Sequence, residues 1–555
     1  MTIRTVVDEA VAKGPGNTAL VFKRNGAWVR RNYRVFGERV AQAAEGFARL
    51  GVEPKRDFVA MILENGPEWV ECYSALAGTG VTVVPIDPKL RGPEISYVLQ
   101  DSQAVAVVAG EAHIETLSLI LPALPAVRSV VLVGGDARPA AVAGRRTESY
   151  EALLAASPVP AQGGRYATCR PAGSDIASII YTSGTTGKPK GAMLTHTNFC
   201  SDAAGALEVI TDVTPRDSFL VVLPLFHSFA FLTNYIVPLC RGCAICFVDS
   251  LRSVGEDCKA LAPTILMAVP LLAEKMHAKI DDKLKRSAVA RVLLRCGLGR
   301  LVGAKVRRQL GGRLRLIIVG GAPCPVQVIQ GFRKLGIGMI EGYGLTETSP
   351  VVSLSRVDDA RPGTIGYKLP NIDIRVADPD AQGVGELQVR GPIVMKGYYR
   401  NPDATAEVFD GEWLRTGDLV SMDADGYLTI RGRKKALIVN REGKNIYPEE
   451  VEQAIAADPR VYDVVVVGYR ERGEVGEKVG AILVPDLETI AAGRGGHTPG
   501  WGEAEALMRQ IVAEQCRCLA DYKHPRKLDV RREPLERTST QKVRRHIYQN
   551  QLDVK

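Results

Sequence analysis

Long apolar runs and aromatic side chains are both scarce in this sequence. No stretch approaches the ~20 consecutive apolar residues that a membrane-spanning helix requires. The N-terminus lacks the apolar core of a secretory signal, so we expect a cytoplasmic protein whose eleven cysteines are reduced thiols rather than a disulfide scaffold. Aromatic residues make up only 6% of the chain and do not alternate with basic residues, which argues against a nucleic-acid partner.

The remaining composition is that of a globular chain with an excess of positive charge. Apolar residues make up 46% and charged residues 24% of the sequence. At 555 residues the chain is too long for one core, so at least two domains are expected. The formal net charge of +9 suits anionic partners such as nucleotides, coenzyme A or an anionic membrane, and does not distinguish among them.

The first four fifths of the chain show strand and helix patterns in alternation. Apolar residues recur at helical spacing from Phe36 to Leu50, and the apolar runs 58–63 and 81–86 are typical of buried strands. This alternation predicts an α/β fold with parallel and mixed sheets covered by helices. Residues 134–175, rich in Ala, Gly, Pro and Arg, are expected to form a loose surface connection.

The pattern changes near residue 433. Beyond it, Pro448 begins a helix, and two strand-like runs follow. We therefore predict a large N-terminal domain, residues 1–433, and a small α+β C-terminal domain, residues 434–555.

The clearest local pattern is a glycine-rich segment, residues 181–191, which follows the apolar run 176–180. Glycines let backbone N–H groups approach a polyphosphate, hydroxyls add donors, and lysines add positive charge. The spacing differs from that of the common P-loop, and a polar turn is the alternative interpretation. The candidate phosphate ligands are Thr182, Ser183, Gly184, Thr185, Thr186, Gly187, Lys188 and Lys190.

The stretch YTSGTTGKPKGAMLTH, residues 181–196, resembles the signature of the AMP-forming acyl-adenylate enzymes. That superfamily includes acyl-CoA synthetases, firefly-type luciferases and the adenylation domains of peptide synthetases. Further motifs of the superfamily follow in order along nearly the whole chain. The resemblance implies that ATP, with Mg²⁺, activates a carboxylic acid as an acyl-adenylate, that coenzyme A then accepts the acyl group, and that the C-terminal domain is mobile.

Two further motifs contribute candidates for the acyl and adenine groups. Residues 224–230 resemble the segment that lines the carboxylate's approach, which implies that His227 gates or orients the acyl group. A partly buried histidine bonded to a backbone carbonyl is the alternative. The turn after the strand-like run 314–319 resembles the adenine-binding turn, with Gly321, Ala322 and Pro323 as candidates.

The segment EGYGLTET, residues 341–348, resembles the superfamily motif that meets adenine and the α-phosphate. Tyr343, between Gly342 and Gly344, offers a flat face for adenine. The resemblance implies that Thr346 donates to the α-phosphate. It also implies that Glu347 is an oxygen ligand for Mg²⁺, which needs few protein ligands beside phosphate oxygens.

Motifs of the last third of the chain supply the remaining candidates. By resemblance, Asp418 accepts from the ribose hydroxyls and Arg433 adds a contact to ribose or phosphate, with a surface ion pair as the alternative for Arg433. Lys435 takes the position of the hinge between domains. Gly443 and Lys444 lie in the segment that would meet coenzyme A.

Residues 537–545 resemble the C-terminal motif that carries the catalytic lysine, here Lys542. Many members have glycine just before that lysine, whereas this chain has Gln541. The catalytic candidates are Lys542, Thr346, Glu347 and His227.

Some alternatives stay open at this point. Cys240, Cys243 and Cys246 have the spacing of an iron–sulfur run, but the fourth ligand is missing at the expected distance, so we interpret them as thiols of a buried strand. The motif at 341–350, followed by Val351, Val352 and Ser353, resembles fatty-acyl ligases more than aryl ligases. An aryl-CoA ligase and an enzyme that loads a carrier protein remain the alternatives to a medium- or long-chain fatty-acid–CoA ligase.

One charge pattern is not explained by these motifs. Between Lys283 and Arg315 there are eleven basic residues and no acidic ones, with apolar residues interleaved. Such a segment predicts peripheral contact with an anionic membrane, where fatty acids partition. A solvated helix face, or a basic wall near ATP or coenzyme A, is the alternative.

We predict that Lys542→Ala nearly abolishes formation of the acyl-adenylate and spares thioester formation from supplied acyl-adenylate. The reason is that the motif assigns this lysine to charge stabilisation in the first half-reaction only. Pyrophosphate release and acyl-CoA yield measure the two halves separately. Equal loss in both would contradict this division of labour.

Overall fold

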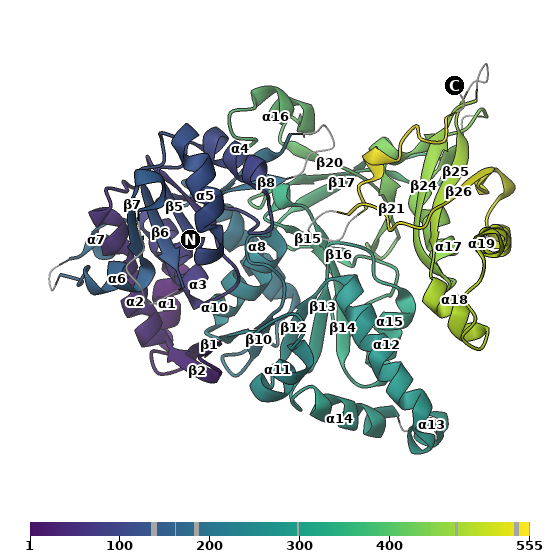
Figure 1. The fold of residues 1–555 in the computed structure, drawn as a ribbon, viewed down its shortest axis with the longest axis horizontal. Helices are drawn as coiled ribbons and strands as arrows, with labels where there is room; N and C mark the ends of the chain where they lie inside the picture. Colours follow the sequence, from purple (N-terminus) through teal and green to yellow (C-terminus); the bar gives the residue numbers. More distant parts are fainter. Residues whose placement is uncertain are drawn as a thin grey trace. The chain divides into compact units, whose positions relative to one another are not determined.

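The computed structural model describes residues 1–134, 141–160, 163–182, 188–296, 299–442, 444–471, 476–537 and 543–553 (Figure 1). The chain forms two compact units. Unit 1 comprises residues 1–374 and 389–414, and unit 2 comprises residues 375–388 and 415–555. Within the described residues, no helix combines the length and the apolar character needed to span a bilayer.

The first sheet of unit 1 has seven strands in the order β7-β6-β5-β3-β4-β8-β9. All neighbours pair in parallel except β8 and β9, which are antiparallel. The strands are β3 (Phe58–Ile62), β4 (Thr82–Pro85), β5 (Ala106–Gly110), β6 (Ser129–Val133), β7 (Arg146–Ser149), β8 (Ile176–Thr182) and β9 (Lys190–Thr195). Most residues of the central strands are buried, as expected for parallel strands covered on both faces.

The second sheet of unit 1 has nine strands in the order β16-β15-β14-β13-β12-β10-β11-β1-β2. Its centre is parallel, and its two edges are antiparallel. The strands are β1 (Thr18–Arg24), β2 (Ala27–Asn32), β10 (Ser218–Val221), β11 (Ala244–Phe247), β12 (Ile265–Ala268), β13 (Leu316–Val319), β14 (Gly338–Gly344), β15 (Val351–Leu354) and β16 (Tyr367–Lys368).

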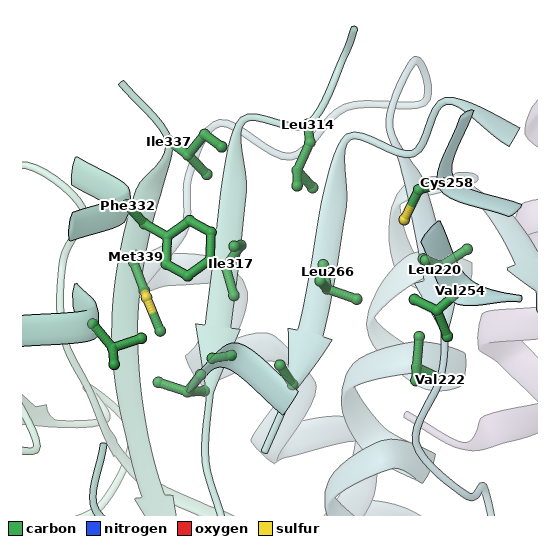
Figure 2. Close-up of a cluster of buried hydrophobic side chains, with 14 of the residues drawn as sticks. Leu220, Val222, Val254, Cys258, Leu266, Leu314, Ile317, Phe332, Ile337 and Met339 are labelled. Carbon is green, nitrogen blue, oxygen red and sulfur yellow. The ribbon is translucent and has the colours of Figure 1, made fainter. Parts of the chain in front are cut away.

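A row of directly opposed side chains forms the core on one face of this sheet. Leu220, Leu266, Ile317 and Met339 pair in register across β10, β12, β13 and β14, and all four are fully buried. Figure 2 shows this row together with Phe332, which packs on it from the covering helix α15 (Val326–Lys334). Three predicted motifs lie at the carboxyl ends of these strands: residues 224–230 after β10, residues 320–323 after β13, and residues 341–348 at the end of β14.

Helices cover the sheets of unit 1. Besides α15, they are α1 (Ile3–Lys13), α2 (Tyr33–Arg49), α3 (Pro67–Thr79), α4 (Gly92–Ser102), α5 (Ile114–Ile120), α6 (Tyr150–Ala155), α7 (Arg165–Thr168), α8 (His196–Val209), α9 (Ser228–Phe231), α10 (Val237–Arg241), α11 (Val254–Leu261), α12 (Pro270–Arg286), α13 (Ala288–Arg295), α14 (Gly299–Gln309) and α16 (Pro402–Val408). A π-helical turn, η4 (Leu232–Ile236), joins α9 to α10.

A third sheet contains the points at which the chain passes between the units. Its strands follow the order β17-β18-β20-β19, with β21 paired to β20. They are β17 (Asp373–Ala377), β18 (Gly385–Arg390), β19 (Phe409–Asp410), β20 (Trp413–Met422) and β21 (Leu428–Arg433).

Unit 2 also has a three-stranded sheet, β24-β25-β26, and the pair β22-β23. Its elements are α17 (Pro448–Ala456), α18 (Leu487–Gly493), α19 (Trp501–Gln515), β22 (Ile438–Val439), β23 (Asn445–Ile446), β24 (Val461–Tyr469), β25 (Lys478–Pro485) and β26 (Lys527–Val530). The helices pack on the sheet around Val451, Ile455, Leu483, Met508 and Ile511.

The predicted α/β class, with parallel and mixed sheets covered by helices and a smaller α+β part, is confirmed. Two details differ from the sequence prediction. Residues 375–388 and 415–433, which the sequence assigned to the large domain, belong to unit 2. Part of the segment 134–175 is structured rather than loose: β7 pairs with β6, and Leu153 and Leu154 of α6 are buried. The small domain's mobility stays a prediction.

A buried carboxylate joins several elements of unit 1. Glu71 on α3 is fully buried and forms ion pairs with Arg31 on β2 and with Arg39 on α2 at 3.0 Å. Tyr150 on α6 donates its hydroxyl to the same carboxylate at 3.0 Å. Burial raises the pKa of Glu71, while the two arginines oppose that rise. Removing one member of such a group leaves buried charges without a partner.

We predict that Glu71→Ala lowers the free energy of unfolding by about 3–5 kcal/mol, because Arg31 and Arg39 lose their buried counter-ion. Urea unfolding followed by intrinsic fluorescence measures the change. Glu151→Ala is the matched control, since Glu151 also pairs with Arg39 but its side chain is 55% exposed, and it should cost less than about 1 kcal/mol. Equal losses in both variants would contradict the prediction.

Candidate active site

The predicted phosphate segment is the connection of a β-hairpin. β8 and β9 pair antiparallel, and Thr182 lies opposite Lys190 at the end of the ladder. The Thr182 hydroxyl donates to the Lys190 carbonyl oxygen at 3.4 Å. Lys188 is exposed. The remaining candidates, Ser183, Gly184, Thr185, Thr186 and Gly187, lie outside the described residues.

Tyr398 connects this hairpin to the predicted magnesium ligand, and sequence reasoning missed it. The Tyr398 hydroxyl donates to Oε1 of Glu347 at 2.7 Å, and the Lys190 ammonium lies 5.3 Å from the Tyr398 ring centroid. Burial, followed by the charge of Glu347, raises the pKa of Tyr398, so the phenol stays protonated and donates. In the sequence, Tyr398 is marked only by its place in an aromatic pair after Gly397, a pattern too common to identify a functional residue.

The segment 341–348 changes from strand to loop just before the candidate residues Thr346 and Glu347. β14 ends at Gly344, where a Cβ atom would lie 1.5 Å from the Pro350 carbonyl oxygen, so no larger residue fits. Thr346 and Glu347 follow in the short helix η5 (Thr346–Thr348). The Thr346 hydroxyl lies 3.2 Å from that of Ser228, which brings the segment 224–230 to this loop.

The predicted adenine turn is held by the first residue of the same motif. Glu341 is buried, and its Oε1 accepts from the backbone N–H of Cys324 at 3.2 Å, just after Gly321, Ala322 and Pro323. Burial raises the pKa of Glu341 to about 7. Sequence reasoning assigned no role to Glu341, because a side chain that bonds to the backbone of a turn about 17 residues earlier leaves no pattern in the motif.

His227 is the N-cap residue that precedes the helix α9. Its Nδ1 accepts from the backbone N–H of Phe229 at 3.3 Å, so the imidazole caps the helix. Phe229 in turn lies close to the adenine turn, since a Cβ atom on Gly320 would lie 3.0 Å from its ring. The structure therefore brings His227, Thr346 and the turn at 320–323 together through Ser228 and Phe229.

A narrow apolar cavity, about 30 Å³ in volume, lies behind these segments. Its lining includes Gly342 of the motif and Phe229, beside His227. Among the described residues that line it, Thr233 has the one polar side chain, and its hydroxyl donates to the Phe229 carbonyl oxygen at 2.7 Å. The other lining residues are Ala206, Leu207, Ile210, Val213, Phe219, Val237, Ile265, Met267, Ile318, Val351 and Leu354.

Unit 2 carries the other candidates. Asp418 is 3% exposed and lies opposite Arg433 in the β20–β21 ladder, where Oδ1 and the Arg433 Nε are 2.6 Å apart. Lys435 lies in the short helix η6 (Lys434–Ala436). The Lys444 ammonium pairs with Glu442 at 2.7 Å and lies 4.7 Å from the Tyr522 ring centroid. Gly443 and Lys542 lie outside the described residues.

The three cysteines with iron–sulfur spacing have other surroundings. The Cys243 thiol donates to the Thr214 carbonyl oxygen at 3.1 Å, and Cys246 packs in the core of the second sheet. Burial raises the pKa of both thiols to about 12, which disfavours thiolate ligands. Among the described residues, no group of three or more His, Cys, Asp or Glu side chains is arranged to hold a metal ion.

Comparison with known proteins decides the family. Residues 7–399 match the model of the AMP-binding enzyme family. The chain belongs to this family. A long-chain-fatty-acid–CoA ligase of Mycobacterium bovis, FadD15, is 32% identical over 494 residues, which are 84% of this chain and 79% of that protein. A feruloyl-CoA synthase of an Amycolatopsis species is 33% identical over 470 residues, 82% of this chain and 83% of its own.

Solved structures agree with this assignment. The ATP-bound structure of MatB from Rhodopseudomonas palustris is 26% identical, with a TM-score of 0.78, and covers 99% of this chain and 98% of its own. The protein is thus an AMP-forming acid–thiol ligase: it activates a carboxylic acid with ATP as an acyl-adenylate and transfers the acyl group to coenzyme A.

The buried Glu341 predicts a specific dependence of stability on pH. Its folded-state pKa of about 7 lies above the ~4.3 of an exposed glutamate, so the stability held by the protonated form is complete below pH ~4.3 and is lost as the pH rises through 7. Glu341→Gln keeps the acceptor oxygen and does not ionise. Between pH 5 and pH 8, the variant should therefore lose about 3 kcal/mol less unfolding free energy than the parent protein.

Urea unfolding at several pH values measures this difference, and subtraction of the two curves removes the contribution of every other titrating group. Parallel curves for the parent and the variant would show that Glu341 ionises normally in the folded protein.

Proposed function

We propose that the acid is a medium- or long-chain fatty acid and that its alkyl chain enters the apolar cavity behind β14. The observation that carries the proposal is the lining, which is apolar apart from Thr233. Because the Thr233 hydroxyl already donates to a carbonyl oxygen, the lining offers a buried phenolic hydroxyl one side-chain acceptor and no side-chain donor, and burying it there would cost free energy. The feruloyl-CoA synthase relative makes an aryl acid the second candidate, and this lining disfavours it.

The cavity is too small for an alkyl chain as it stands, so lining side chains must move when the chain enters. About 30 Å³ is room for roughly one water molecule or one methyl group. Phe219, Phe229 and Met267 are the largest side chains of the lining, and we expect rotation of Phe229 or Met267 to lengthen the cavity. The relative FadD15, by name a long-chain-fatty-acid–CoA ligase, supports an acid of this kind.

The other candidate residues act on the phosphates and the carboxylate. We propose that Thr346 donates to the α-phosphate and that His227, fixed by its helix cap, orients the carboxylate. Lys188, Lys190 and the hairpin loop neutralise the polyphosphate, and Lys542 stabilises charge during attack on the α-phosphorus. The thiol of coenzyme A attacks the acyl carbonyl carbon, and AMP leaves.

The surroundings of Glu347 suit a magnesium ligand. Tyr398 occupies Oε1, and Oε2 accepts from no other residue that the structure describes. One carboxylate oxygen beside phosphate oxygens and water is a normal environment for Mg²⁺, which would offset the charge of the leaving pyrophosphate. Tyr398 holds this carboxylate in one rotamer, so its orientation is set before ATP binds.

In unit 2, we propose that Asp418 accepts from the ribose hydroxyls. The ion pair with Arg433 holds the Asp418 carboxylate in place. We propose that Lys435 is the hinge and that Gly443 and Lys444 contact coenzyme A.

We also propose that the protein makes a peripheral contact with the membrane in which such acids dissolve.

Two opposite changes in the cavity test the choice of acid. Ala206→Leu fills the cavity and should lower kcat/KM for the longest accepted acids about tenfold, while the shortest change less than about twofold. Met267→Ala enlarges the cavity and should shift the preference toward longer acids. Pyrophosphate release, measured with fatty acids from acetate to stearate and with ferulate, gives the profile.

Omission of coenzyme A from the same assays controls for the acceptor, since adenylate should form without acyl-CoA. Loss of kcat/KM by the same factor for every acid in both variants would show that the alkyl chain does not enter this cavity. A preference of the parent protein for ferulate would overturn the fatty-acid proposal.

A further inference from the structure

Two helices of unit 1, α13 and α14, present apolar side chains to solvent. Val289 and Val292 on α13 are 70% and 59% exposed, and Leu301 on α14 is 59% exposed. Val289, Val292 and Cys296 follow at spacings of three and four residues, so they share one face of α13. Leu293 instead packs in a small cluster with Val302 and Val306 of α14. The exposed face is therefore additional to the contacts that hold the helices together.

The basic residues of this region divide into two groups. Some have structural tasks: Arg307 donates to the carbonyl oxygens of Leu335 and Gly336 at 3.3 and 2.9 Å, and Arg315 pairs with Asp217 at 3.1 Å. At the end of α12, two further cations are neutralised. Those ion pairs are Lys285 with Asp281 at 2.7 Å and Arg286 with Asp282 at 3.1 Å.

The basic residues of the second group do not stabilise the fold through such contacts. Lys283, Arg295, Lys305 and Arg308 are exposed and form no ion pair or hydrogen bond with any residue that the structure describes. Leu301, Lys305 and Arg308 share one face of α14, because they are spaced by four and three residues. Exposed apolar and unpaired basic side chains thus occur together on α13 and α14, and no acidic residue lies between 283 and 315.

We propose that this face, defined by Val289, Val292, Leu301, Lys305 and Arg308, docks on an anionic phospholipid bilayer. The basic side chains meet the phosphate and carboxylate groups of the lipid, and the valines and leucine enter the boundary between headgroups and acyl chains. The face has the two components that such docking requires, whereas nucleic acid would use the charges alone. A membrane also supplies the substrate, and that purpose rests on the proposed fatty-acid activity.

Co-sedimentation of the full-length protein with vesicles tests the proposal without using turnover, so it can fail while the proposed activity stands. The protein should bind vesicles of phosphatidylcholine and phosphatidylserine at low salt, release them at high salt, and not bind phosphatidylcholine alone. The variant K305Q/R308Q should bind about 30-fold more weakly, since each basic residue near the surface contributes ~1 kcal/mol. The variant V289S/V292S should also bind more weakly while keeping every charge.

The matched control is K13Q/K55Q, which removes the same charge from lysines that are 73% and 59% exposed elsewhere on unit 1. It should bind vesicles like the parent protein, and kcat with a short, water-soluble acid should be unchanged in all three variants. Failure of the parent protein to bind anionic vesicles at low salt would overturn the proposal. It would also be overturned if K13Q/K55Q weakened binding as much as K305Q/R308Q, or if V289S/V292S had no effect.

Discussion

The candidate site of unit 1 depends on a short extended segment, residues 395–399, that joins two sheets. Its backbone bonds to β9 of the first sheet, through Lys396 to Met193 and Tyr399 to Gly191, at 2.9 and 2.8 Å. On its other side, the Met395 N–H donates to the Glu347 carbonyl oxygen at 2.9 Å, and Glu347 follows β14 of the second sheet. The hydrogen bond from Tyr398 to Glu347 completes this connection. The β8–β9 hairpin and the segment 341–348, about 160 residues apart in sequence, are thereby connected by hydrogen bonds.

Features that depend on local composition could be predicted from the sequence. The glycine-rich segment between β8 and β9 and the alternation of strands and helices follow from patterns within about a dozen neighbouring residues, whereas the roles of Thr346 and Glu347 come from the motif's resemblance and stay predictions. Tyr398 and Glu341 could not be found in this way, because each acts on a backbone or side chain brought near by the fold. The boundary at residue 433 differs from the structure for a similar reason: β18, β20 and β21 form one sheet through pairing across separate segments.

The roles of the basic residues also depend on contacts that the fold creates and that a local sequence pattern does not show. The sequence shows eleven basic residues between Lys283 and Arg315 as one pattern. In the structure, Arg307 and Arg315 hold neighbouring backbone and acidic groups, while Lys305 and Arg308 stay in solvent. A basic segment therefore combines residues that stabilise the fold with residues available to a partner, and only burial and hydrogen bonding separate the two.

The interrupted course of the chain has a consequence for how the protein is made. Unit 2 includes residues 375–388, yet residues 389–414 return to unit 1 before the rest of unit 2 follows. On a ribosome that adds ~5–20 residues per second, β17 and β18 emerge seconds before β20 and β21, the strands that complete their sheet. During that interval an edge of β18 has no neighbour, and such edges invite wrong pairing. Slow translation across residues 389–415 would prolong this exposure, and a chaperone that covers extended segments would act there first.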